Sequence, residues 1–294
     1  MIRLGLQIFG AFAVLLLMPG CGENLESPAQ TSEFGPPANL KAYSVSASTV
    51  RLQWGAAPGA GDSVFAGYTV QWGGTADPVG NNVLQYDADS LFPGEILFTV
   101  VSRKLNGDLS NGATIRWAPA ERFDAPFVLY EYRLQYPTSD AGLDIGTKSV
   151  DPEAMPLPTG STGVTGMDIY LFGGEGQITD PLELRSASLY AGTWNLTLFS
   201  TLTDHAASLD YPLAGFPALS TFTEDHMAVT DSTIYYVRVQ GENQEFNFAR
   251  LYVRLKQGPP SGQRAVEIRV SLQKVPGVPY ASRTMFHNRE EEKT

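Results

Sequence analysis

The strongest constraint on the fold is a strict alternation of apolar and polar side chains. In residues 264–273, apolar side chains recur at every second position, at Val266, Ile268, Val270 and Leu272. A period of two residues places these side chains on one face of a β-strand. No segment of the sequence shows an amphipathic helical period of useful length. We therefore predict an all-β fold of antiparallel sheets, each with one face in water.

The composition supports a globular protein with many turns. The chain holds 29 glycines and 20 prolines, which favour turns because glycine accepts positive φ and proline fixes φ. Hydrophobic residues make up 43% of the chain and charged residues 17%, a balance typical of folded proteins. Its length of 294 residues is enough for one large domain or two medium ones.

The first twenty residues have the features of an export signal. Arg3 supplies a positive charge, and residues 4–18 are apolar apart from Gln7. This run has the length of a signal-peptide core and is too short for a membrane-spanning helix, which needs about 20 residues. It leads directly to Cys21, the only cysteine of the chain.

Residues 17–21, Leu-Met-Pro-Gly-Cys, resemble a bacterial lipobox. The resemblance implies cleavage before Cys21, diacylation of its sulfur with palmitate-type chains, and acylation of the new amine. Two or three such chains hold a protein stably on a bilayer. Gly22 then favours the outer membrane as the location in the cell envelope. We predict a signal peptide over 1–20 and a flexible tether over 21–35. The alternative is a plain secretory signal or a buried cysteine.

A first folded unit is expected over residues 36–120. Val50, Leu52 and Trp54 alternate with polar residues and predict a strand with one buried face. Further strand-like runs and turns lie at 67–72, 91–94, 98–102, 106–108 and 113–117.

The order of these motifs resembles a fibronectin type III domain. The resemblance is carried by the P-P-x-x-L start at Pro36, the V-x-L-x-W and G-Y-T-V-Q-W strands, the L-x-P-G turn and the N-G-D-L-S segment. It implies a β-sandwich that acts as a spacer or a protein-binding module. One departure is Leu97, which stands where the family usually has a tyrosine that holds a strand corner.

A second folded unit is expected over residues 121–280, as an antiparallel β-sandwich of jelly-roll type. Phe248, Arg250 and Tyr252 fall on the face of their strand that we expect to meet water. The strand-like runs of this unit lie at 127–136, 166–172, 182–190, 193–200, 232–240, 245–256 and 264–273.

Two stretches of the second unit lack a strand pattern. Residues 151–166 and 201–231 are predicted to be long loops, which are the usual place for a binding site on a rigid β-frame. The charged tail at residues 281–294 is expected to be loose.

Aromatic side chains are the first candidates for a binding site, because a stacked ring can hold the face of a sugar. The candidates are Trp194, Tyr190, Tyr211 and Tyr235. The alternative is packing in the core or on a sheet face, the commoner use of large aromatic residues.

A haem site is the second possibility. His205 and His226 form no H-x-H or H-x-x-x-H pair, so exposed loop histidines are the ordinary interpretation and no metal site is expected. The runs T-I-Y-Y-V-R-V-Q and F-A-R-L-Y-V-R-L are similar to strands of haemophore-type outer-membrane lipoproteins. This resemblance implies His205 and His226 as iron ligands. The residues themselves indicate no cofactor.

The sequence carries no catalytic signature. Gly160-Ser161-Thr162-Gly163 lacks the spacing of a nucleophile elbow. We therefore expect a binding or structural module and no enzyme. The alternative is an anchored glycan-active hydrolase, because scattered Asp and Glu residues permit a carboxylate pair.

The charge of the chain bears on its partners. The net charge is -11, and Lys and Arg residues are not clustered, so nucleic acid is not an expected partner. The expected partners are a membrane, through the lipid anchor, and a protein or glycan ligand.

Overall fold

The computed structural model describes residues 34–132, 139–146, 151–157, 166–174, 179–190, 195–241, 244–256 and 263–278. Residues Glu33–Thr294 form one compact unit. Apart from short 3-10 turns, such as η1 (Ala187–Leu189) and η2 (Leu219–Thr221), the regular elements in the described part are β-strands. The all-β prediction is confirmed. None of the described helices is long and apolar enough to cross a membrane.

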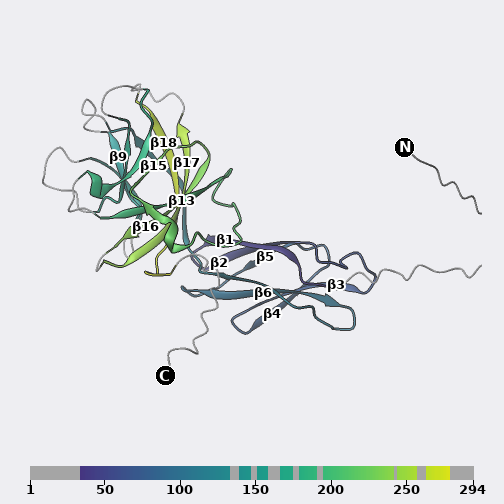
Figure 1. Ribbon diagram of the computed structural model, residues 1–294. Helices are drawn as coiled ribbons and strands as arrows, with labels where there is room; N and C mark the ends of the chain where they lie inside the picture. The colour runs from purple at the N-terminus through teal and green to yellow at the C-terminus, as the bar shows by residue number, and fades with distance from the viewer. Residues whose placement is uncertain are drawn as a thin grey trace, which may run out of the picture. The chain divides into compact units, whose positions relative to one another are not determined.

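The first sandwich packs a three-stranded sheet against a four-stranded sheet, and these sheets form two layers in Figure 1. The three-stranded sheet has the order β1 (Ala38–Ser46), β2 (Thr49–Gly55), β5 (Gln85–Ala88). The four-stranded sheet has the order β4 (Thr75–Val79), β3 (Phe65–Trp72), β6 (Ile96–Lys104), β7 (Ala113–Trp117). All strand pairings in these two sheets are antiparallel, which supports the fibronectin type III-like fold.

The alternation in β2 identified the core of the first sandwich correctly. Val50 and Leu52 are fully buried, and Trp54 is 5% exposed.

The corner at Leu97 is built without a tyrosine. Instead, the buried Leu91 donates its backbone N–H to the carbonyl oxygen of Ser48 at 3.0 Å. This backbone bond ties the loop after β5 to the start of β2.

The second sandwich consists of a five-stranded and a six-stranded antiparallel sheet. The five-stranded sheet has the order β10 (Glu153–Pro156), β9 (Asp140–Asp144), β11 (Ile169–Phe172), β12 (Glu183–Ser186), β15 (His226–Ala228). The six-stranded sheet has the order β14 (Phe222–Glu224), β13 (Thr197–His205), β16 (Thr233–Gln240), β17 (Phe246–Lys256), β18 (Ala265–Gln273), β8 (Glu121–Tyr130).

The strand order refines the jelly-roll comparison. Strands β16, β17 and β18 are neighbours both in sequence and in the sheet, and β8, which precedes them in the chain, pairs with β18. Three consecutive strands beside a fourth that is joined by a long connection form one Greek key, whereas a jelly roll combines two Greek keys. Consecutive hairpins therefore dominate this sandwich. Its interior is filled by alternate residues such as Leu251, Val253 and Ile268, all fully buried.

The outer face of the six-stranded sheet corrects one prediction. Phe248 and Tyr252 are each 3% exposed and Arg250 is 1% exposed, although all three were expected to meet water. The segment between β13 and β14 covers this face, and Arg250 donates from Nη2 to the carbonyl oxygen of Tyr211 at 2.8 Å. Alternation gave the correct two faces of β17 but did not show that the second one is covered.

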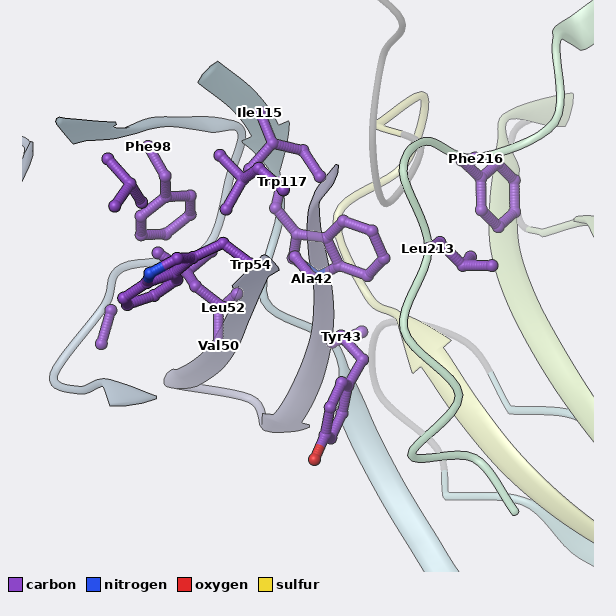
Figure 2. Packing of buried hydrophobic residues seen from close by; sticks show 14 of the residues in the cluster. Ala42, Tyr43, Val50, Leu52, Trp54, Phe98, Ile115, Trp117, Leu213 and Phe216 are labelled. Carbon is purple, nitrogen blue, oxygen red and sulfur yellow. The ribbon is translucent and has the colours of Figure 1, made fainter. Parts of the chain in front are cut away.

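The segment at residues 206–221 also joins the two sandwiches. Ala42 of β1 and Leu213 exchange two backbone hydrogen bonds of 2.9 Å. Figure 2 shows Leu213 beside the strand that carries Ala42, with Phe216 farther along the same segment. Both side chains belong to one apolar cluster with the core of the first sandwich. The predicted binding loop at 201–231 is therefore wrong, because this stretch contains strands and a packed connection.

Candidate ligand-binding surface

Four aromatic rings gather on the outer face of the five-stranded sheet. Tyr170 and Phe172 project from β11 on the side opposite the buried Ile169 and Leu171, because side chains alternate along a strand. Two rings from other segments join them. We call the four rings the aromatic patch: Tyr132, Tyr170, Phe172 and Tyr190.

The rings of the aromatic patch meet edge to face. The centroid of Tyr190 lies 5.5 Å from that of Tyr132 and 5.8 Å from that of Tyr170. Tyr170 and Phe172 are 6.4 Å apart at 82°. Edge-to-face contacts of this kind stabilise a fixed arrangement of rings. Tyr170 is buried, whereas the other three rings are half-buried, so the patch keeps apolar surface in reach of a ligand.

A guanidinium group borders the aromatic patch. The Cζ atom of Arg185 lies 3.6 Å from the ring centroid of Phe172, within the range of a cation–π contact. Glu183, two residues earlier on β12, holds the same guanidinium at 2.7 Å. Arg185 is thereby fixed with its charge beside exposed aromatic surface. Tyrosine and arginine are the residue types enriched at binding hot spots.

The hydroxyl groups of Tyr170 and Tyr190 stay protonated at neutral pH, because the pKa of each is raised. Burial, and then a hydrogen bond with Tyr132, raise the pKa of Tyr190 to about 12. Burial also raises the pKa of Tyr170, against an opposing hydrogen bond from Arg185. The patch therefore offers neutral hydroxyl groups at its polar edge, which can donate or accept hydrogen bonds.

The structure separates the four aromatic candidates named from the sequence. Tyr190 belongs to the aromatic patch, and Trp194 lies outside the described residues. Tyr235 is 1% exposed in the core between the two sheets, and its hydroxyl donates to the carbonyl oxygen of Ala228 at 2.8 Å. Tyr211 packs against the cluster that joins the sandwiches. The binding assignment of Tyr235 is corrected to a packing role, whereas Tyr211 is only partly buried and its assignment stays a prediction.

The two histidine candidates do not come from one sheet. His205 ends β13 in the six-stranded sheet, and His226 begins β15 in the five-stranded sheet. Both side chains are exposed, and Nδ1 of His226 lies 2.7 Å from Oδ1 of Asp225. Within the described ranges, no three His, Cys, Asp or Glu residues are grouped in a way that could hold a metal ion.

Two neighbouring carboxyl groups lie at the five-stranded sheet, where the half-buried Asp144 ends β9 and Asp168 precedes β11. Asp168 is fully buried and its carboxyl group is hydrogen-bonded to that of Asp144. The oxygens of Asp168 also accept from the backbone N–H of Ile145 at 2.8 Å and from Nδ2 of Asn195 at 3.0 Å. A glycosidase needs its two carboxyl groups about 5–10 Å apart around a sugar. This pair is in direct contact and lacks that geometry.

Burial dominates the titration of this pair. It raises the pKa of Asp168 well above its usual range, and the negative charge of Asp144 adds to the shift. Burial likewise raises the pKa of Asp144, and the charge of Glu153 on the paired strand β10 adds to it. The folded chain therefore binds more protons here than the unfolded chain. The contribution of the pair to stability is full at acidic pH and is lost as pH rises through the raised pKa values.

We expect Asp144→Asn to be more stable than the wild type at pH 8, because the amide can donate to Asp168 without adding a second charge. Urea unfolding at pH 5 and pH 8 measures this difference. Asp168→Asn is the contrasting variant. Its amide group would face Nδ2 of Asn195, which is also a donor, so this variant should be less stable than the wild type at both pH values. Equal destabilisation by both variants at pH 8 would contradict the shared-proton arrangement.

The first sandwich has a shallow depression of about 330 Å³ beside the turn between β3 and β4. Its lining residues are Gln71, Trp72, Gly73, Gly74, Thr75, Ala76, Leu97 and Thr99. None of these side chains is an acid, a base or a thiol, so the hydroxyl groups of Thr75 and Thr99 have no base beside them in this lining.

Comparison with known proteins identifies no family for this chain. No family model and no curated protein matches the sequence. Among 26 matching chains of solved structures is the crystal structure of the chicken CNTN1 FN1-FN3 domains. That chain is 10% identical, and the match covers 85% of this chain and 87% of that one with a TM-score of 0.23. A score this low carries no argument about function, and the fibronectin type III-like assignment rests on the strand order of the first sandwich.

Proposed function

We propose that this protein is a lipid-anchored lipoprotein of the cell envelope, held at the outer membrane by acylated Cys21, that binds a ligand through the aromatic patch. Fibronectin type III-like domains often serve as binding or structural modules, and here the first sandwich is the spacer. The second sandwich carries the binding surface. The protein has no catalytic role in this proposal.

The observation that carries the binding role is the aromatic patch with Arg185 fixed beside it. Three half-buried rings, held edge to face with the buried Tyr170, present a rigid apolar surface, so little side-chain entropy is lost when a ligand covers them. The hydroxyl groups and the guanidinium at the rim supply directional contacts. This combination suits a protein or glycan ligand and provides no group for bond cleavage.

Site-specific photo-crosslinking in cells tests the binding role. A photoreactive phenylalanine analogue replaces Tyr190 in one variant and Phe92 in a control variant. Phe92 lies on the first sandwich and is 84% exposed. We expect a discrete adduct at position 190 only, because a ligand covers the patch. Staining and mass of the adduct then distinguish a protein ligand from a glycan.

A second substitution makes the crosslinking result specific. Phe172→Ala removes the ring under Arg185 and should reduce the adduct at position 190 at least about tenfold, which corresponds to a hot-spot loss above about 1.4 kcal/mol. The same adducts from positions 190 and 92, or no adduct from position 190, would contradict the proposed binding surface.

A further inference from the structure

Exposed apolar side chains concentrate at one end of the first sandwich. Among eleven large apolar side chains exposed in the described part of the chain, five lie in the loops β2–β3, β4–β5 and β6–β7. We call these five side chains the loop tip: Val64 (51% exposed), Val83 (37%), Leu84 (41%), Leu105 (72%) and Leu109 (50%).

The strand registers place the three loops at the same end. The end of β2 pairs with the start of β5, through Gln53 and Gln85. The start of β3 pairs with the end of β6, through Phe65 and Lys104. The loops also touch directly, because the backbone N–H of Leu105 donates to the carbonyl oxygen of Val64 at 2.9 Å.

The hairpin between β6 and β7 holds Leu105 outward. Gly107 has a φ of +93°, and its N–H donates to the carbonyl oxygen of Lys104 at 3.0 Å. The N–H of Lys104 in turn donates to the carbonyl oxygen of Asp108 at 2.9 Å. This tight turn leaves Leu105 the most exposed side chain of the loop tip, in a fixed position on the end of a hairpin.

The polypeptide enters the first sandwich at the loop tip. The ring of Phe34 lies 4.6 Å from Nζ of Lys104, at the end of β6. Gly35 approaches Pro58 in the β2–β3 loop so closely that an added Cβ would lie 3.3 Å from its Cγ. The chain leaves for the second sandwich at the opposite end, after Trp117, which pairs with Ile96 at the start of β6.

The length of the connection limits the distance between the loop tip and the acylated residue. Residues 22–33 separate Cys21 from Phe34. At 3.3–3.6 Å per residue, a fully extended chain of this length spans about 45 Å at most. If Cys21 is acylated, a bilayer therefore lies within that reach of the loop tip.

The charge of the loop tip suits an apolar contact. The three loops contain the carboxylates of Asp62 and Asp108, and the cations of Arg103 and Lys104 lie at the strand end beside them. Positive and negative charges balance, so neither attraction to anionic headgroups nor strong repulsion from them is expected. Exposed leucine and valine side chains gain free energy when they leave water for the acyl region of a bilayer.

We propose that the loop tip rests on the lipid bilayer that holds acylated Cys21, with Leu105 inserted most deeply. This inference rests on the proposed function, because the anchor selects the lipid surface as the partner. Insertion fixes the first sandwich upright on the membrane, so that the spacer has a defined orientation. The exposed apolar side chains of the loop tip then serve as a second, weaker membrane contact.

Spin labelling of the full acylated chain tests the proposal. Acylation occupies the sulfur of Cys21, the only natural cysteine, so Leu105→Cys introduces the only reactive thiol. Phe92→Cys is the matched control, because Phe92 is exposed in the loop between β5 and β6 at the opposite end. Each protein is nitroxide-labelled and reconstituted in vesicles of phosphatidylethanolamine and phosphatidylglycerol, and mass spectrometry verifies the acyl chains.

We expect the label at position 105 to become severalfold more accessible to oxygen than to a water-soluble nickel chelate upon reconstitution, while the label at position 92 does not change. If acyl mass is present and neither label changes, the loop tip does not contact lipid and the inference is overturned. The unacylated Cys21→Ser chain gives a second check, without vesicles. If raising the protein concentration shields its label at position 105 from the nickel chelate, a second copy covers the loop tip and the inference is also overturned. Absence of acyl mass would overturn the anchor itself.

Discussion

Replacing Phe216 by alanine should lower the free energy of unfolding by about 3–5 kcal/mol, the usual cost of deleting a buried phenylalanine ring. Phe216 is 2% exposed and lies on the segment that covers the six-stranded sheet. Its ring centroid is 5.3 Å from that of Tyr236, 5.8 Å from that of Phe222 and 5.9 Å from that of Phe248. Loss of this ring leaves a cavity that three aromatic neighbours cannot fill.

The same variant should also change the form of the transition. Phe216 belongs to the cluster that runs into the core of the first sandwich, so its loss uncouples the two sandwiches while their own interiors stay packed. Urea unfolding followed by tryptophan fluorescence should show two transitions in place of one. Phe92→Ala, at an 84% exposed position, should change stability by no more than about 0.5 kcal/mol. A Phe216→Ala protein as stable as this control would contradict the packing described for the segment.

Replacing Arg264 by leucine should cost about 3–5 kcal/mol, because it leaves a buried carboxylate without its cation. The side chain of Glu131 is only 1% exposed. Its Oε2 accepts from Nε of Arg264 at 2.9 Å, and its Oε1 accepts from the backbone N–H of Arg264 at 3.0 Å. Nη2 of Arg264 also donates to the carbonyl oxygen of Gly173 at 2.9 Å. One guanidinium thus ties three separate segments of the second sandwich together.

Two further variants separate the charge effect from simple loss of packing. The double variant Glu131→Leu with Arg264→Leu should recover part of the stability, since it removes the uncompensated carboxylate. Lys256→Leu is the control, because its 3.0 Å pair with Glu267 is partly exposed and should contribute about 1 kcal/mol or less. Thermal unfolding of the four proteins compares them. A double variant no more stable than Arg264→Leu would contradict the buried-charge explanation.

The alternation of side chains predicted most of the long strands, but it missed β1 and several short strands. It located β2, β17 and β18 because each has one face in a core. Strands β4 and β5 went unnoticed, since both lie at a sheet edge and their sequences, T-A-D-P-V and Q-Y-D-A, have few apolar residues. An edge strand tolerates a proline such as Pro78 because one side of its backbone needs no partner. Local sequence contains no signal for that pairing.

The covered face of β17 shows a second limit of sequence patterns. Alternation separates the two faces of a strand, but it does not show whether another segment lies over the more polar one. Arg250 is charged and yet buried, because a segment about forty residues earlier in the chain supplies its acceptor at Tyr211. Burial of this kind depends on long-range packing, which the pattern of one strand does not encode.

The candidate site was predictable only in part. Tyr190 could be named from the sequence as an aromatic candidate for binding. Nothing in the sequence places its ring beside those of Tyr132 and Tyr170. The parallel bridge between Tyr132 and Phe172 and the pairing of β11 with β12 bring those rings and Arg185 together. The contact between Asp144 and Asp168 was missed for the same reason, because Asp144 ends β9 and Asp168 lies just before β11, far apart in the sequence.

The central claim is that the chain is anchored to a membrane through Cys21. Its most direct test is the intact mass and membrane partition of the full chain expressed in a bacterial host, with the wild type beside Cys21→Ser. We predict that the wild type begins at residue 21, carries acyl mass on that residue and stays with the membranes, whereas Cys21→Ser is released from them. If both proteins are unmodified and neither partitions with membranes, the anchor is absent, and the proposed function and the membrane contact of the loop tip are both contradicted.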